Sequence, residues 1–209
     1  MSVLVAISIM RDNPYSHTVG EVEFREILEE AFVARAQHIE QWYDEGIATR
    51  NSFAFCLLDP TASASASSDD SILATAVIGP EGQRFLPNAI AKVLKLRDND
   101  GLPLGALLMS QSHRLADGDF RWDGAVCVDG TYVGGSGLAV PQDRYQNGRL
   151  ALSFNYRIQT AKAVWDNEHP MTGEPSWSWF CNENKPGERY DLEEVLARHA
   201  ASHEWSCTT

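Results

Sequence analysis

The chain has 209 residues, 44% hydrophobic and 22% charged, which is the composition of a globular protein with a sizeable core. Its 29 acidic residues outnumber 17 basic ones, and the resulting net charge of −12 opposes binding to the phosphate backbone of a nucleic acid. No apolar run is long enough to span a bilayer, so neither a nucleic acid nor a membrane is an expected partner.

The first ten residues, MSVLVAISIM, are apolar but have no basic segment before them and no small-residue cleavage pattern. We therefore predict a buried first strand here instead of a signal peptide. The four cysteines are scattered without CxxC spacing, in a chain too large to need disulfides for its stability: Cys56, Cys127, Cys181 and Cys207. Reduced thiols and a cytoplasmic location are the expectation.

The next segments predict a helix, a hairpin and a second helix. A helical stripe of mainly apolar residues marks the first: Phe24, Ile27, Leu28, Ala31, Phe32, Arg35 and Ile39. The segments 52–58 and 71–79 are short, apolar and bounded by turn residues, as paired strands are. Between them the small polar residues of 60–70 predict a flexible insertion. Helical spacing then returns over 87–101.

A glycine-rich segment, DGTYVGGSGLAVPQD, covers 129–143. A phosphate loop needs a helix directly after its glycines, and Pro141 argues against one because it disfavours the helical conformation of Val140. The pair Asp129-Gly130 instead predicts a type I′ turn between strands 125–128 and 131–140. Glycines inside a strand indicate either tight packing or close approach of a ligand, and both explanations remain open. We predict that the ligand contacts this strand.

The region after Pro141 allows two interpretations. Asn147-Gly148 is a hairpin signal, and the alternating apolar residues from Leu150 to Ile158 fit a strand. The same region also carries a helical stripe: Leu150, Phe154, Ile158, Ala161 and Trp165. Beyond it, we predict a C-terminal extension over 169–209 with an aromatic cluster and a short helix, following one domain over 1–168.

Two motifs resemble those of the GlcG/HbpS family, also called the haem-degrading domain. They are NAIAKV, at 88–93, and WDGAVCVDGTYVGGSGLAVPQD, at 122–143. The resemblance implies an α/β (α+β) fold with a profilin-like antiparallel sheet and packed helices in a single domain. It also implies a homo-oligomer, a bulky planar ligand such as haem, and a helix near Leu150.

The candidate catalytic residues are acid/base side chains near the glycine-rich hairpin. Asp143 matches the acidic residue of the family motif, Asp123 and Asp129 flank the hairpin, and His113 stands in a polar stretch before it. Most turn aspartates only bond their own backbone, and this is expected of Asp129. A carboxyl group at a pocket mouth can instead have a pKa raised into the range of proton transfer, and we select His113, Asp123 and Asp143.

The candidate ligand contacts are strand glycines, basic side chains and aromatic rings: Gly134, Gly135, Lys92, Arg144, Trp122, Trp177 and Trp179. No metal site is expected, because the one close histidine pair, His199 and His203, lacks the glutamate of an HExxH motif. The glycines also lack the GxSxG spacing of a hydrolase.

Two functional hypotheses follow. In the first, the protein binds a bulky planar organic ligand, with haem as the cofactor that the resemblance implies. In the second, it is a cofactor-independent isomerase, cyclase or dehydratase that acts on an organic metabolite by acid/base catalysis.

Overall fold

The computed structural model describes residues 5–63, 65–99, 101 and 123–169. Up to Glu168 these residues belong to one compact unit, a single α+β domain. Its five strands form one antiparallel sheet in the order β1-β3-β2-β5-β4. The strands are β1 (Val5–Ile9), β2 (Phe53–Leu58), β3 (Ile72–Ile78), β4 (Val126–Val128) and β5 (Thr131–Ser136). The helices are α1 (Glu21–Asp44), α2 (Ser68–Ser71), α3 (Leu86–Asp98) and α5 (Val140–Glu168), with the 3-10 helix η1 at Gly82–Phe85.

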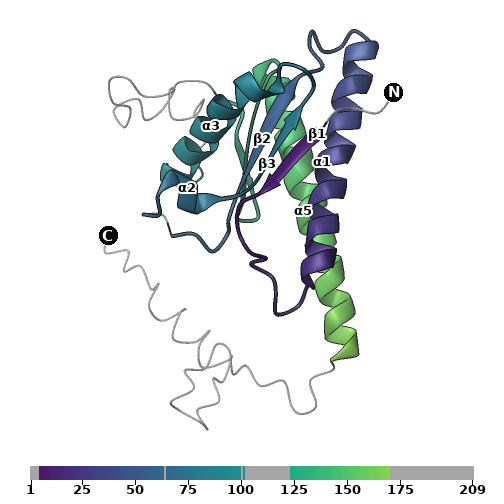
Figure 1. Ribbon diagram of the computed structural model, residues 1–209, viewed down its shortest axis with the longest axis vertical. Helices are drawn as coiled ribbons and strands as arrows, with labels where there is room; N and C mark the ends of the chain where they lie inside the picture. The colour runs from purple at the N-terminus through teal and green to yellow at the C-terminus, as the bar shows by residue number, and fades with distance from the viewer. Residues whose placement is uncertain (1–4, 64, 100, 102–122, 170–209) are drawn as a thin grey trace, which may run out of the picture. The chain divides into compact units, whose positions relative to one another are not determined.

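Helices cover both faces of this sheet (Figure 1). Helices α1 and α5 pack against one face and against each other, whereas α3 packs on the opposite face over β2 and β5. The central strand β2 is buried along its whole length for this reason. Its alternate residues serve the two layers: Phe53, Phe55 and Leu57 join the α1/α5 core, and Ala54, Cys56 and Leu58 join the α3 core.

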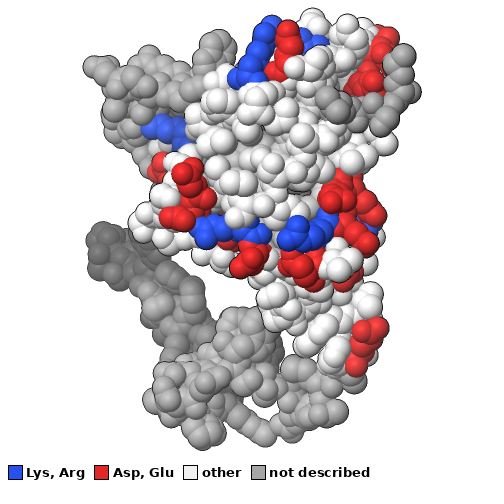
Figure 2. All heavy atoms as spheres, viewed as in Figure 1, with Lys and Arg blue, Asp and Glu red and all other residues white. Residues whose placement is uncertain are grey.

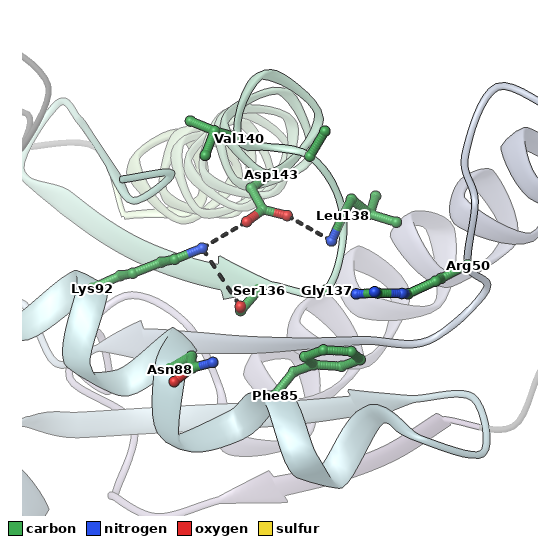
Figure 3. A pocket seen from close by; sticks show the side chains of 10 residues that line it. Arg50, Phe85, Asn88, Lys92, Ser136, Gly137, Leu138, Val140 and Asp143 are labelled. Atoms are coloured by element: carbon green, nitrogen blue, oxygen red, sulfur yellow. Dashed lines mark hydrogen bonds and ion pairs between the residues drawn. The ribbon is translucent and has the colours of Figure 1, made fainter. Parts of the chain in front are cut away.

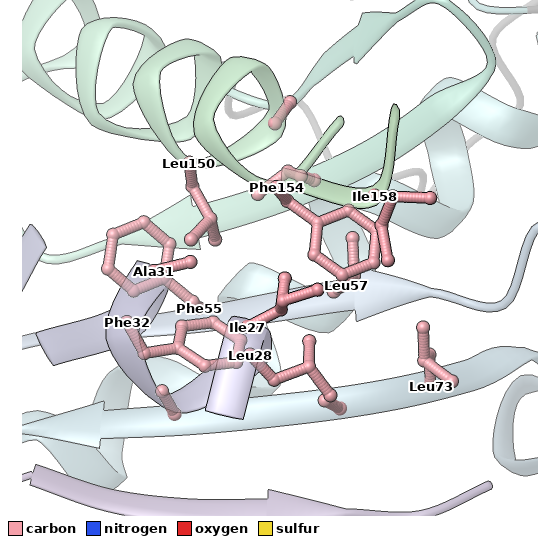
Figure 4. Packing of buried hydrophobic residues seen from close by; sticks show 14 of the residues in the cluster. Ile27, Leu28, Ala31, Phe32, Phe55, Leu57, Leu73, Leu150, Phe154 and Ile158 are labelled. Carbon is pink, nitrogen blue, oxygen red and sulfur yellow. The ribbon is translucent and has the colours of Figure 1, made fainter. Parts of the chain in front are cut away.

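The predicted first helix is confirmed as α1, and its apolar stripe faces the sheet. Figure 4 shows Ile27, Leu28 and Phe32 from this helix pointing at Phe55 and the neighbouring strands. Leu150, Phe154 and Ile158 approach the same core from α5. The two long helices are thus held together by apolar side chains that also contact the sheet, and burying these is the main favourable term in folding.

The first strand differs from its prediction. β1 is an edge strand that pairs only with β3 among the described strands, and it is half-buried on one face and exposed on the other. Val5, Ile7 and Ile9 pack against the α1/α5 core, while Ala6 and Ser8 are exposed. The sequence did not show this alternation of half-buried and exposed positions, because the exposed positions at the start of the chain include apolar residues, alanine and methionine.

The predicted hairpin of β2 and β3 is confirmed, with Phe53 opposite Ile78. Part of the stretch that we predicted as a flexible insertion forms the short helix α2. The Ser67 hydroxyl caps α2 by accepting a hydrogen bond from the Asp70 N–H, and Arg11 forms an ion pair with the Asp70 carboxylate. The predicted second helix is confirmed as α3.

The region after Pro141, for which the sequence allowed two interpretations, is helical: Asn147-Gly148 is not a turn and Leu150 does not lie in a strand. Both belong to α5, whose buried side includes Leu150, Phe154, Ile158 and Ala161. The helical stripe prevails over the alternating pattern because α1 and the sheet together bury one side of the helix. Leu152 and Tyr156, the other members of the alternating set, are exposed.

On the face drawn in Figure 2, lysine and arginine side chains lie among aspartate and glutamate and form no continuous basic surface. Among the described residues, no helix is both long enough and apolar enough to cross a membrane.

Candidate functional site

The glycine-rich segment forms the predicted hairpin of β4 and β5. Asp129 and Gly130 both have positive φ, 48° and 81°, as a type I′ turn requires. Asp129 is therefore a turn residue, as expected. β5 ends at Ser136, four residues before the end that we predicted at Val140.

Gly134 and Gly135 lie where α3 and α5 pack closely on the two faces of the sheet. A Cβ on Gly134 would come within 2.2 Å of the Ala89 carbonyl oxygen in α3. A Cβ on Gly135, on the other face, would lie 2.2 Å from the Asn147 Oδ1 atom in α5 and 2.6 Å from the Phe53 ring. Of the two open explanations, this geometry favours tight packing over contact with a ligand at these two glycines.

The end of β5 leads into α5, so the prediction that no helix follows the glycines is wrong. A helix does follow the glycines, because Pro141 lies in its first turn, where the missing N–H costs no helical hydrogen bond. The chain's own side chains cap this end of the helix. Asp143 Oδ1 accepts the Leu138 N–H at 3.0 Å, and Gln142 Oε1 accepts the Ala139 N–H at 3.2 Å.

A buried ion pair joins α3 to α5. The Lys92 Nζ atom donates to Asp143 Oδ2 at 2.6 Å, and the two side chains are 5% and 2% exposed. Lys92 Nζ also donates to the Gly135 carbonyl at 3.1 Å and contacts Ser136 Oγ at 3.5 Å. Both charged groups therefore have polar partners, which a buried charge requires. The pair links the end of the glycine-rich strand to the helices on either side of the sheet.

Gly124 supports this pair from the segment before β4. Its φ of +127° is strained for any other residue, and a Cβ there would lie 2.9 Å from the Asp143 Cβ atom. The Asn147 side chain donates from Nδ2 to the Gly124 carbonyl at 2.7 Å. A position that only glycine fits is thus fixed directly against Asp143, so the backbone itself closes this side of the site.

Burial raises the pKa of Asp143 to about 6. The nearby Lys92 ammonium and the Leu138 N–H act in the opposite direction, because both stabilise the carboxylate. A carboxyl group with a pKa near neutrality can exchange a proton at physiological pH, which an ordinary aspartate does not do.

The ion pair lies at the wall of a pocket of about 290 Å³. Of the described residues, ten line it: Arg50, Phe85, Asn88, Lys92, Ser136, Gly137, Leu138, Ala139, Val140 and Asp143. Figure 3 shows Arg50 across the pocket from Lys92, with Phe85 and Asn88 along one side. Arg50 is exposed, its guanidinium lies 5.7 Å from the centre of the Phe85 ring, and it forms no ion pair with any described residue.

The structure brings together three of the predicted site residues, because Lys92 contacts both Asp143 and the carbonyl of Gly135. Asp123 accepts the Gly124 N–H at 2.6 Å and forms an ion pair with Arg144, and neither residue lines the pocket. Four further candidates lie outside the described residues: His113, Trp122, Trp177 and Trp179.

Of the described lining residues, only Lys92 and Asp143 were predicted from the sequence; Arg50, Phe85, Asn88 and Ser136 are among those that were not. One signal was available, because Asn88 and Lys92 are four residues apart in a predicted helix and so share one side of it. Arg50 and Phe85 belong to loop and 3-10 segments whose place in space no periodicity predicts.

The described residues do not fit haem well. Those that line the pocket include no histidine, cysteine or methionine, the side chains that commonly ligate haem iron, and the volume lies just below the usual range for small-molecule sites. Among the described residues no group of three or more metal-ligating side chains occurs.

Comparisons of the chain with protein-family models, with curated proteins and with solved structures find no match. The resemblance to the GlcG/HbpS family therefore remains a prediction from its two motifs.

Proposed function

We propose that this protein binds a small organic anion in the pocket between α3 and the start of α5. The observation that supports this most is the unequal charge of the lining. Lys92 is neutralised by Asp143, whereas Arg50 has no acidic partner among the described residues and faces the same pocket. An arginine guanidinium binds carboxylates and phosphates with paired hydrogen bonds, so a ligand that carries such a group would complete the site.

The rest of the lining is compatible with a compact ligand that is polar at both ends. Phe85, Leu138 and Val140 supply apolar surface, while Asn88 and Ser136 supply hydrogen-bonding groups. Such a mixture of apolar walls and a few polar groups is typical of small-molecule sites. We therefore favour a small metabolite over haem, the ligand that the family resemblance implied.

A second candidate is a cofactor-independent enzyme that acts by acid/base catalysis. The raised pKa of Asp143 supports it, since a carboxyl group that ionises near neutral pH can both take up and return a proton. A test of ligand binding serves both candidate functions, because an enzyme of this kind would also have to bind its substrate in this pocket.

The test is a thermal-shift and calorimetric screen of the full-length protein against small carboxylates, small phosphate esters and haem. We expect binding of one or more carboxylates or phosphate esters, weakened at least tenfold by Arg50→Gln. Arg84→Gln is the matched control, because Arg84 also lies over the Phe85 ring, at 4.8 Å, but does not line the pocket. Binding of haem alone, or equal losses in the two variants, would contradict the proposal.

A further inference from the structure

We propose that the ligand is an oxo acid, a small carboxylate that also carries a carbonyl group, and that the pocket enolises it. This inference rests on the anion binding proposed above. The ligand's carboxylate pairs with Arg50, its carbonyl oxygen accepts a hydrogen bond from Lys92, and Asp143 removes a proton from the carbon next to the carbonyl. This class of ligand fits a pocket with Arg50, which has no acidic partner among the described residues, at one end and the Lys92–Asp143 pair at the other.

Lys92 is able to donate to a ligand without losing its ion pair. Two of its contacts are short, at 2.6 Å to Asp143 and 3.1 Å to the Gly135 carbonyl. The third, to Ser136 Oγ, is 3.5 Å long, at the outer limit of a hydrogen bond. A carbonyl oxygen that enters the pocket can replace this weakest contact. An ammonium group held in place before the reaction stabilises the negative charge that develops on the oxygen.

Asp143 is held in a defined orientation by contacts to both carboxylate oxygens. Its Oδ1 accepts the Leu138 N–H and its Oδ2 accepts from Lys92, so the group does not need to reorient before it takes a proton. Its side chain is nearly inaccessible to solvent. A base that is desolvated and fixed in position saves reorganisation during proton transfer. Burial also raises its pKa to about 6, close to the range where a base is most effective.

The reaction balances without any other reactant. The C–H bond next to the carbonyl breaks, the proton passes to the Asp143 carboxylate, and the electron pair of that bond forms a carbon–carbon double bond. The carbonyl electron pair moves to oxygen, where the Lys92 ammonium stabilises the enolate. In heavy water, the protonated Asp143 exchanges its proton for a deuteron that reaches it through the pocket while the enolate is bound. Transfer of this deuteron from Asp143 to the same carbon regenerates the oxo acid with deuterium in place of hydrogen. Transfer to another carbon of the enolate system isomerises the ligand.

The experiment measures deuterium incorporation into 2-oxobutyrate and laevulinate by proton NMR, with the full-length protein in heavy water. In these probes the carbonyl lies at different distances from the carboxylate. We expect exchange of at least one probe at least tenfold faster than in buffer. Arg50→Gln should reduce this exchange tenfold or more, whereas Arg84→Gln should leave it unchanged. Asp143→Asn should abolish it, with circular dichroism to verify that the variant folds.

The wild-type protein provides a readout that does not depend on the folding of a variant. Its exchange rate should rise with pH as Asp143 ionises and level off above about pH 6 to 7, after the buffer rate is subtracted. If a probe binds but exchanges no faster than in buffer, or if the exchange rate does not change with pH as Asp143 ionises, the enolisation proposal is wrong while the anion-binding proposal stands. If neither these probes nor any other small anion binds, both proposals fail.

Discussion

Gly134 is a position where one added methyl group should destabilise the fold. Its Cβ would lie 2.2 Å from the Ala89 carbonyl oxygen and 2.8 Å from the Val93 Cβ atom, both in α3. A carbon and a carbonyl oxygen that are not bonded to each other rarely approach closer than about 3.3 Å. Gly134→Ala therefore requires α3 to move away from β5 by about 1 Å, because backbone atoms cannot rotate aside as a flexible side chain can.

The cost can be approximated from known effects of overpacking. Extra methyl groups in a well-packed core destabilise by about 1–3 kcal/mol, and replacement of glycine in a strand returns about 0.5–1 kcal/mol. A displacement of α3 also weakens the contacts of Val93 and Leu96 with the sheet. We expect Gly134→Ala to lower the free energy of unfolding by about 2 kcal/mol. It should also weaken ligand binding, since Lys92 and Asn88 move with α3.

The assay is urea unfolding followed by far-ultraviolet circular dichroism. The control is Gly148→Ala in α5, where a Cβ has no neighbour within 4 Å. Alanine suits a helix better than glycine, so this variant should gain about 0.5–1 kcal/mol. If Gly134→Ala stays within about 0.5 kcal/mol of the wild type, the close packing of α3 on β5 is not what this glycine serves.

The other predictions concern the same sheet and its pocket. Gly135→Val should destabilise the fold by about 2 kcal/mol or more, because its Cβ would meet Asn147 and Phe53; a variant of unchanged stability that loses only ligand binding would instead indicate a ligand against this glycine. Because the pKa of Asp143 is raised by folding, the native state binds its proton more tightly than the unfolded state between about pH 4 and 6. The stability of the wild type relative to Asp143→Asn should therefore fall as pH rises through this window and level off above it, and a difference that grows with pH would contradict the raised pKa. Burial raises the pKa of the Cys56 thiol to about 12, so iodoacetamide at pH 8 should modify the half-buried Cys127 long before Cys56; mass spectrometry of peptides measures the order.

Several elements of this fold were predictable from the sequence because local chemistry decides them. The stripe from Phe24 to Ile39 has one helical period and one buried side, so α1 was predicted correctly. The Asp129-Gly130 turn needed positive φ at both positions, which few other residue pairs tolerate. Lys92 and Asp143 were both predicted as site residues. They are more than fifty positions apart in the sequence, however, and their contact could not be predicted from it.

The tertiary structure decided the remaining features, because they depend on what packs against each segment. Leu150 to Ile158 fits either period by itself, and it is a helix because α1 and the sheet bury one side of it. Asn147-Gly148, a turn signal in isolation, lies inside that helix, where the Asn147 side chain holds the Gly124 carbonyl. Arg50 reaches the pocket only because the chain returns to the sheet at β2. The burial that raises the pKa of Asp143 exists only once α3 and α5 have packed on opposite faces of β5.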